Sequence, residues 1–412
     1  MNTKYASSGD VSTNINRRHF IAGTGATLGL TLLTPSLAFG AETGPTLNLG
    51  LIGCGGRGKW IADLFRKHGG YKLVAVADYF PDRADQAGTE FGVPTERRFT
   101  GLSGYKRLLE QKLDAVVIQS PPYFHPEQAA AAVDAGKHVY LAKPVAVDVP
   151  GCQSVAASGV RAKEKNLCFL VDFQMPTLPL FQDAVAQIKK GELGTIVSAE
   201  AGYQTGLVGE SVDRERRADP ANPELRLRAW VTDRVLSGDV IVEQNIHAID
   251  MACRLLDAAP LRAYGTGGKT RDFVGDCWDH FSVVFDFPNK VTTTFSSKQV
   301  GFGIDDIMCR VYGTNGTADM HYFDKSLIKT TENGSSATPT NLYTTGAEAN
   351  IAAFHMAISK RDFANLTVPP AVRSNLTAIL GRAAAYRRST VTWEEMIRAN
   401  EPFVAKLQGL KA

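Results

Sequence analysis

Short apolar runs alternate with segments of helical periodicity from residue 46 onward. Four runs have the length and composition of buried strands: Thr46–Ile52, Leu73–Ala77, Asp114–Gln119 and His138–Leu141. Apolar residues at helical spacing mark four segments between or beside them: Trp60–Arg66, Arg83–Phe91, Tyr105–Gln111 and Glu127–Ala135. Strands that alternate with helices predict a doubly wound parallel sheet of the Rossmann type, whose ligands bind at the carboxyl ends of the strands.

The pattern changes after Phe173, where strand-like runs follow one another without helices between most of them. These runs are Thr195–Gln204, His280–Phe287, Lys290–Ser297 and Arg310–Tyr312. They predict a second domain with an open, mostly antiparallel β-sheet. Helices are predicted at Leu178–Lys190, Ala347–Lys360, Val372–Tyr386 and Trp393–Ala399, and we expect the last three to pack on the first domain. Residues 331–346 are predicted to form a surface loop.

Residues 205–228 interrupt the second domain with a segment rich in Arg, Glu and Pro. We interpret this segment as an excursion from the sheet. It would either line the substrate site or extend to a partner subunit.

A glycine-rich turn stands between the first predicted strand and the first predicted helix. Gly53, Gly55 and Gly58 form the pattern G-x-G-x-x-G. The first glycine permits a tight turn, the second lets the backbone approach a pyrophosphate, and the third lets the helix pack closely on the strand. The free amides near Gly56 and Arg57 would face the phosphates. The turn therefore predicts a dinucleotide site.

Asp78 ends the second predicted strand, 20 residues after Gly58. An acid at this spacing accepts hydrogen bonds from the ribose hydroxyls of a dinucleotide and repels a 2′-phosphate. The sequence therefore favours NAD(H). Arg83 lies near enough to keep NADP(H) as an alternative.

The first 40 residues have the organisation of a signal peptide. Arg17 and Arg18 precede a weakly apolar run over 21–33, and small residues surround Phe39 before Ala41. Adjacent arginines in this position predict export by the twin-arginine machinery to the periplasm or beyond. The run is shorter than the roughly 20 apolar residues of a membrane span, so no membrane anchor is expected. The predicted organisation is thus 1–40 signal peptide, 41–168 dinucleotide-binding domain and 169–412 substrate and oligomerisation domain.

Charge and cysteine content limit the partners and ligands that the sequence predicts. The formal net charge is +3, and removing residues 1–40 would leave +1, so nothing predicts a nucleic-acid partner. The six cysteines form no CxxC pair and are not clustered with histidines at zinc spacing. They are interpreted as buried or inert thiols, and no metal is expected.

Further motifs follow the glycine turn in a fixed order. They are Ala77-Asp78, Ser120-Pro121-Pro122 with His125, Ala135-Gly136-Lys137-His138-Val139, Lys143-Pro144, Gly191-x-x-Gly194, Ile246-His247-Ala248-Ile249-Asp250, Leu380-Gly381-Arg382 and Val391-Thr392-Trp393. In this order, the chain from 46 to about 400 resembles the Gfo/Idh/MocA family, that is, glucose-fructose oxidoreductase and inositol dehydrogenase. The resemblance implies a homo-oligomer (dimer or tetramer) through the open sheet. It also places Ser120, Pro121, His125 and Lys143 beside the cofactor.

The resemblance implies a catalytic set of Lys143, His247 and Glu243. Oxidation of an alcohol requires removal of the hydroxyl proton, which a lysine or histidine tuned near the working pH can perform. Two positions depart from the family pattern: Ala142 replaces the acid of Glu-Lys-Pro, and Glu243 replaces an Asp. On one continuous helix, Glu243, His247 and Asp250 would share a face. That arrangement leaves a cation site as a weaker alternative.

These features predict an exported oxidoreductase that transfers hydride between a tightly held nicotinamide cofactor and a sugar or polyol. Nicotinamide cofactors are not expected free outside the cytoplasm, and the twin-arginine route carries folded proteins with their cofactor inside. Two alternatives remain at this stage. One is a redox-neutral NAD-dependent glycoside hydrolase or epimerase, and the other is a non-catalytic sugar-binding protein.

Overall fold

The computed structural model describes residues 44–206, 208–301 and 303–412, and the predicted signal peptide lies outside them. Six parallel strands form the first sheet, in the order β3-β2-β1-β4-β5-β6. The strands are β1 (Leu47–Ile52), β2 (Tyr71–Asp78), β3 (Arg98–Thr100), β4 (Ala115–Ile118), β5 (His138–Ala142) and β6 (Phe169–Asp172). The helices that alternate with them are α1 (Gly56–His68), α2 (Pro81–Glu90), α3 (Gly104–Leu109), α4 (His125–Asp134) and α5 (Val149–Glu164). This arrangement confirms the predicted Rossmann sheet.

The sequence pattern did not identify β3, α5 or β6. The strand β3 has three residues, all only partly buried, so it has no apolar run. The strand β6 begins directly after residue 168, where the first domain was predicted to end, and it pairs with β5.

Nine strands form the second sheet, in the order β14-β13-β12-β11-β7-β10-β9-β8-β15. Its strands are β7 (Ile196–Gln204), β8 (Arg262–Gly268), β9 (His280–Asp286), β10 (Thr292–Lys298), β11 (Asp306–Gly313), β12 (Gly316–His321), β13 (Ser326–Thr330), β14 (Gly334–Ala337) and β15 (Val391–Thr392). Among the described residues of this sheet, only β7 and β10 pair in parallel. The predicted open, mostly antiparallel sheet is confirmed.

The prediction of a loop over 331–346 was wrong in part. This stretch contains β14, which pairs with β13, and the beginning of α12 (Leu342–Lys360). The strand β14 consists of small residues, mostly exposed, at the edge of the sheet. Backbone pairing with β13 forms this strand, so no alternation of apolar and polar residues marks it in the sequence.

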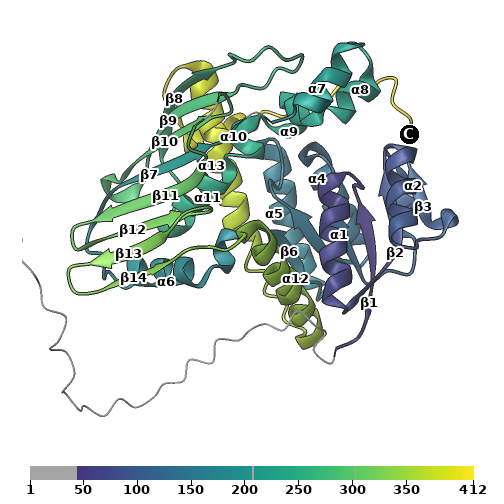
Figure 1. Cartoon of the computed structure of the whole chain (residues 1–412), viewed down its shortest axis with the longest axis horizontal. Helices are drawn as coiled ribbons and strands as arrows, with labels where there is room; N and C mark the ends of the chain where they lie inside the picture. Colours follow the sequence, from purple (N-terminus) through teal and green to yellow (C-terminus); the bar gives the residue numbers. More distant parts are fainter. Residues whose placement is uncertain (1–43, 207, 302) are drawn as a thin grey trace, which may run out of the picture. The chain divides into compact units, whose positions relative to one another are not determined.

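The two faces of the second sheet differ. Along β9 and β10, buried residues alternate with exposed ones, as expected when one face is covered. The helices α11 (Ile246–Leu255) and α13 (Val368–Arg387) pack on the covered face (Figure 1). The other face leaves apolar side chains exposed, among them Tyr264 at 53% and Val284 at 39%.

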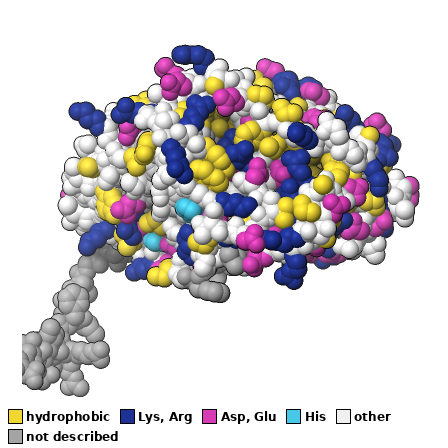
Figure 2. All heavy atoms as spheres, turned by 90° about the horizontal axis from the view of Figure 1, so that it is seen from above, with side chains coloured by type: hydrophobic (Ala, Val, Ile, Leu, Met, Phe, Trp, Pro, Cys, Tyr) yellow, Lys and Arg dark blue, Asp and Glu magenta, His cyan; other side chains and the backbone are white. Residues whose placement is uncertain are grey.

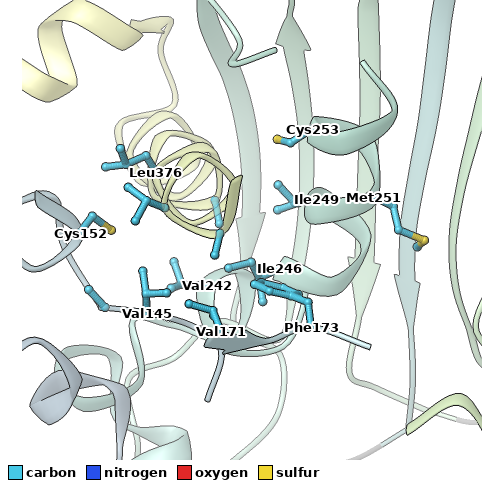
Figure 3. Close-up of a cluster of buried hydrophobic side chains, with 14 of the residues drawn as sticks. Val145, Cys152, Val171, Phe173, Val242, Ile246, Ile249, Met251, Cys253 and Leu376 are labelled. Carbon is cyan, nitrogen blue, oxygen red and sulfur yellow. The ribbon is translucent and has the colours of Figure 1, made fainter. Parts of the chain in front are cut away.

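A continuous hydrophobic core joins the two sheets. Figure 3 shows Ile249 and Cys253 pointing from α11 toward Leu376 of α13, while Met251 leaves α11 on the opposite side. Val171 and Phe173, at the end of the first sheet, belong to the same buried cluster. The carboxyl ends of the first sheet's strands are therefore held against the helices of the second domain.

The three C-terminal helices do not all pack on the same domain. The helix α12 packs on α1 and β6, as predicted, and α13 contacts both α5 of the first domain and β8 of the second. The helix α14 (Trp393–Ala399) instead packs on α13 and β15, which corrects the expectation that it covers the first domain. A terminal helix's partner depends on three-dimensional proximity, which helical periodicity does not encode.

The cysteines agree with the sequence interpretation. All six cysteines are buried and free. On the face shown in Figure 2, basic and acidic side chains are interspersed, with hydrophobic side chains between them. In the described part of the chain, no helix is both long and apolar enough to cross a membrane.

Candidate functional site

The glycine turn has the backbone geometry that its sequence predicts. Gly53 adopts a φ of +91°, and a Cβ there would lie 2.5 Å from the carbonyl carbon of Gln119. A Cβ on Gly58 would lie 1.9 Å from the carbonyl oxygen of Gly53. These two positions admit only glycine, because the turn and the close approach of α1 leave no room for a side chain.

Open space lies above the other two glycines of the turn. A Cβ on Gly56 would meet no heavy atom within 4 Å, and one on Gly55 would meet only Arg83 Nη1, at 3.9 Å. Gly55 caps α1 without any side-chain hydrogen bond, so the first amides of the helix stay available for an anion. At the end of β4, the side-chain nitrogen and oxygen of Gln119 are buried without partners. The turn therefore fits a dinucleotide, with polar groups left to meet it.

A cleft of about 250 Å³ opens from this turn along the carboxyl ends of β1, β2 and β4. Its lining includes Asp78, Arg83, Ser120 and Pro121. Two helices of the predicted excursion, α7 (Glu210–Arg217) and α8 (Pro223–Arg228), contribute residues to the opposite wall. The excursion thus lines the dinucleotide cleft, and its expected role at the substrate site or toward a partner subunit stays a prediction.

Asp78 is fixed at the wall of this cleft. One carboxylate oxygen accepts from the amide of Cys54 at 2.7 Å and the other from the amide of Phe80 at 2.9 Å. Burial raises the pKa of the carboxyl above its usual value. The guanidinium groups of Arg83 and Arg228 lie over the ring of Phe80, at 4.9 and 4.0 Å. One acid and two cations therefore meet where the ribose was predicted to bind.

His125 supports the site from behind. It is fully buried, with Nδ1 2.7 Å from the carbonyl oxygen of Pro144 and Nε2 2.8 Å from that of Ser120. Burial lowers its pKa to about 4, so the ring is neutral near pH 7. The histidine thereby ties the end of β4 to the Lys143-Pro144 turn after β5, as expected of a supporting residue.

Lys143 is joined to Glu243 across the domain boundary. Its Nζ donates to the carbonyl oxygen of Glu243 at 2.5 Å and to the carboxylate at 3.3 Å. Burial lowers the pKa of Lys143, and the charge of Arg57 lowers it further, whereas Glu243 raises it. Ala142 leaves the lysine without the acid usual in the family. Glu243 supplies a carboxylate from the second domain.

The expectation that Glu243, His247 and Asp250 share one helix face was wrong. Glu243 ends the short helix α10 (Val240–Glu243), and His247 belongs to α11, which begins after the intervening Gln244 and Asn245. Asp250 accepts from Arg254 Nε and from Ser374 Oγ, each at 2.7 Å. It therefore joins α11 to α13 and does not face Glu243. Within the described ranges, no group of three His, Cys, Asp or Glu residues is placed to hold a metal ion.

Aromatic rings surround His247. Its Nδ1 lies 3.0 Å from the hydroxyl of Tyr322, and the rings of Phe173, Tyr203 and Tyr343 lie within 6.5 Å, centroid to centroid. Burial and the charges of Lys143 and Arg57 lower its pKa well below the usual value. The imidazole is therefore neutral, and Nε2 is the nitrogen that can meet a substrate hydroxyl.

The predicted role of Arg57 lies in its backbone amide, whereas its side chain makes a separate contact. Its Nη2 donates to the carboxylate of Asp172 at 2.8 Å, at the end of β6. The other oxygen of that fully buried carboxylate accepts from Asn350 of α12 at 2.9 Å. The guanidinium thus points toward the lysine and histidine, while the Arg57 backbone remains in the first turn of α1.

Several residues of this site were not found in the sequence. They are Asp172, Tyr203, Tyr322, Tyr343 and Asn350, which come from both sheets and from α12. None belongs to a short motif, and each reaches the site only through folding, so spacing along the chain holds no signal for them.

Comparison with known proteins agrees with this geometry. Residues 47–173 match the family model described as "Oxidoreductase family, NAD-binding Rossmann fold", and residues 181–319 match the Gfo/Idh/MocA C-terminal domain. The chain is 26% identical over 252 residues to scyllo-inositol 2-dehydrogenase (NAD(+)) of Bacillus subtilis (strain 168), covering 60% of this chain and 66% of the relative. It is also 26% identical to a glycosyl hydrolase family 109 protein of Shewanella pealeana, covering 46% of each.

Solved structures show the same fold. Levoglucosan dehydrogenase in complex with NADH and levoglucosan superposes with a TM-score of 0.68 at 19% identity, covering 84% of this chain and 99% of that one. The matched regions span about half to two thirds of the two curated relatives described above. Both domains match models of one family and the dinucleotide cleft is intact, so this chain belongs to the Gfo/Idh/MocA oxidoreductase family.

Proposed function

We propose that this protein transfers hydride between a tightly held NAD(H) and a secondary alcohol or ketone of a sugar or polyol, or an aldose. The observation that carries this proposal is the buried contact of Lys143 with Glu243, beside the neutral His247. The pair adjoins the dinucleotide cleft through the His125 bridge. Lys143 therefore lies directly after the carboxyl end of strand β5, the edge at which such sheets bind their ligands.

The residues of the site have different roles in the oxidation. When bound, the nicotinamide accepts hydride from the carbon that bears the hydroxyl group. Lys143 or His247 takes the hydroxyl proton as the carbonyl forms. Glu243 orients Lys143, which would take the proton as its neutral amine, and Tyr322 orients the imidazole through Nδ1. The aromatic rings around His247 keep water from the reacting carbon.

The first experiment tests whether the cofactor is carried by the protein. The mature chain is purified without added nucleotide and denatured, and the released NAD(H) and NADP(H) are measured. We expect stoichiometric NAD(H). The holoenzyme is then assayed against inositols, aldoses and anhydrosugars, with Lys143→Ala as the matched inactive variant. A protein that neither contains nor binds a nicotinamide nucleotide would support the sugar-binding alternative instead.

Redox-neutral chemistry is a second candidate, because the chain resembles a glycosyl hydrolase family 109 protein over 46% of its length. Transient oxidation of a sugar makes the neighbouring C–H acidic, which permits elimination or epimerisation before the hydride returns. Reaction in deuterated water separates the two functions. Deuterium in the product without net reduction of the cofactor indicates the redox-neutral reaction.

Export by the twin-arginine machinery is also part of the proposal, on the basis of Arg17 and Arg18. Fractionation of cells that express the full chain tests it, with both arginines replaced by lysine as the control. We expect the mature protein in the periplasm or medium for the natural sequence and retention in the cytoplasm for the variant.

The open face of the second sheet supports a homo-oligomer. It exposes the neighbouring residues Tyr264 and Val284, an apolar surface that a second copy would cover. Light scattering on the natural chain and on Tyr264→Arg tests this arrangement. We expect a dimer or tetramer that the arginine variant disrupts.

A further inference from the structure

The segment that follows α14 crosses the dinucleotide-binding domain. It begins near Glu401, and the amide of Phe403 donates to Asp148 Oδ2 at 2.7 Å. Near its end, Lys411 accepts from the amide of Leu102 at 3.0 Å through its carbonyl oxygen. In Figure 1 the segment runs as a yellow trace to the side of α2, where the chain ends. Residues 401–411 are called the tail here.

The tail is tied to residues that line the cleft. The amide of Lys411 donates to the hydroxyl of Tyr79 at 3.1 Å, and Tyr79 and Leu102 both line the cleft. The hydroxyl of Tyr79 also donates to Glu224 of α8 at 2.9 Å. Arg226 of α8 donates to the carbonyl oxygen of Lys406 at 3.1 Å. The tail thus holds α8 and the cleft wall together.

The helix α8 is also bound directly to the first domain. Arg228 donates to both carboxylate oxygens of Asp82, at 3.0 and 3.1 Å. Its guanidinium covers the ring of Phe80 at 4.0 Å. Because Asp78 marks the ribose end of the cleft, α8 lies over the adenosine half of the site.

A small hydrophobic cluster lies beneath these contacts. Its four buried members are Phe80, Leu227, Leu236 and Ala405, and it is separate from the larger core clusters. Phe80 and Leu227 also line the cleft, whereas Ala405 belongs to the tail. A cluster of this size can open locally while the main core stays folded.

We propose that α8, the following turn η4 (Trp230–Thr232) and the tail form a clasp over the adenosine half of the cleft, and that opening of this clasp limits release of the dinucleotide. The inference rests on the proposed function, since it requires the cleft to hold NAD(H). It assigns the retention of the cofactor to named contacts outside the glycine turn: Arg228 with Asp82, Tyr79 with Glu224, and the tail with Leu102.

Two variants open the clasp in different ways. Asp82→Asn weakens the pair with Arg228, and Asp82 lines no part of the cleft. Ending the chain at Pro402 removes every residue of the tail after Pro402, and with them its contacts to Asp148, Arg226, Tyr79 and Leu102. Asp257→Asn is the matched control, because Asp257 is likewise exposed and pairs with a part-buried arginine, Arg373, at 2.9 Å far from the cleft. Thermal unfolding reports whether each variant keeps its fold.

The measurement is the rate at which bound NADH fluorescence is lost when the holoprotein is mixed with excess NAD⁺. We expect about fivefold faster release from Asp82→Asn, more than about tenfold faster release from the truncated chain, and an unchanged rate for Asp257→Asn. Release within about twofold of the natural chain in Asp82→Asn overturns the clasp, even if the truncated chain does not fold. A natural chain that binds no NAD(H) at all contradicts the proposed function itself.

Discussion

The Nζ of Lys143 lies 2.5 Å from the backbone carbonyl oxygen of Glu243 and 3.3 Å from its carboxylate, and the two residues come from different domains. The environment of Lys143 therefore depends on the position of α10, which packs chiefly on α13. The carboxylate opposes the effect of burial on the lysine, so Glu243 determines how readily Lys143 gives up its proton.

Replacing Glu243 by Gln should move the pH dependence of polyol oxidation. Glu243 raises the pKa of Lys143, so loss of its charge lowers that pKa and makes the neutral amine available at lower pH. We expect the acidic limb of kcat/KM to shift to lower pH. An unmoved limb would assign the proton transfer to His247, because Glu243 does not contribute to the lowered pKa of that ring.

Two alanine substitutions in the glycine turn should separate folding from cofactor binding. Gly58→Ala places a Cβ 1.9 Å from a backbone oxygen, and we expect it to destabilise the fold by about 1–3 kcal/mol. The Cβ added by Gly56→Ala has no heavy atom within 4 Å, so the melting temperature should not change. The added methyl group instead occupies space reserved for the pyrophosphate, and the Kd for NAD⁺ should rise about tenfold. Equal loss of stability in both variants would contradict this separation.

Asp78→Asn should weaken the discrimination between NAD(H) and NADP(H). The carboxylate of Asp78 opposes a 2′-phosphate, whereas Arg83 and Arg228 lie in the same part of the cleft. Once the negative charge is removed, these two cations should favour the phosphate. We expect the ratio of Kd values to move toward NADP⁺ by about tenfold, as measured by titration. The natural chain serves as the reference, and an unchanged ratio would remove Asp78 from cofactor selection.

His321 should make the stability of the second domain depend on pH. Its Nδ1 lies 2.6 Å from Asp306 Oδ2 and its Nε2 lies 2.9 Å from Asp319 Oδ1, and Arg310 also pairs with Asp319. These carboxylates raise the pKa of His321 to about 9, from the usual 6.5. Because the folded state holds the proton more tightly, the stabilisation is complete below pH 6.5 and is lost as pH rises through about 9.

Urea unfolding of the natural chain and of His321→Gln at both ends of this range measures the effect. The difference in free energy of unfolding between the two chains should be larger at pH 6 than at about pH 9.5. A difference that stays constant with pH would show that the histidine contributes only through packing.

Local patterns in the sequence were sufficient to predict the two-sheet architecture. Each predicted strand and helix corresponds to an element of the structure, because a buried strand needs an apolar run and a packed helix needs an apolar stripe. Some of the elements missed have weak patterns, such as β3, or form by edge pairing, such as β14. The buried strand β6 and the helix α5 were missed although their residues carry apolar side chains.

The features of the candidate site were likewise predicted only in part. The glycine turn and Asp78 were recognised because backbone approach and ribose binding require particular residues at a fixed spacing along one βαβ unit. The break between α10 and α11 was not recognised, because apolar spacing continues across it, so the predicted common face of Glu243 and Asp250 was wrong.

The sequence by itself determined the Rossmann sheet and the dinucleotide turn, since each depends on residues close together in the chain, and the family resemblance singled out Lys143 and His247. Only the tertiary structure decided what surrounds them. The carboxylate that faces Lys143, the tyrosines around His247 and the tail over the cleft come from distant elements. Burial and long-range charge set the pKa values of the site, and both are properties of packing that no spacing along the chain contains.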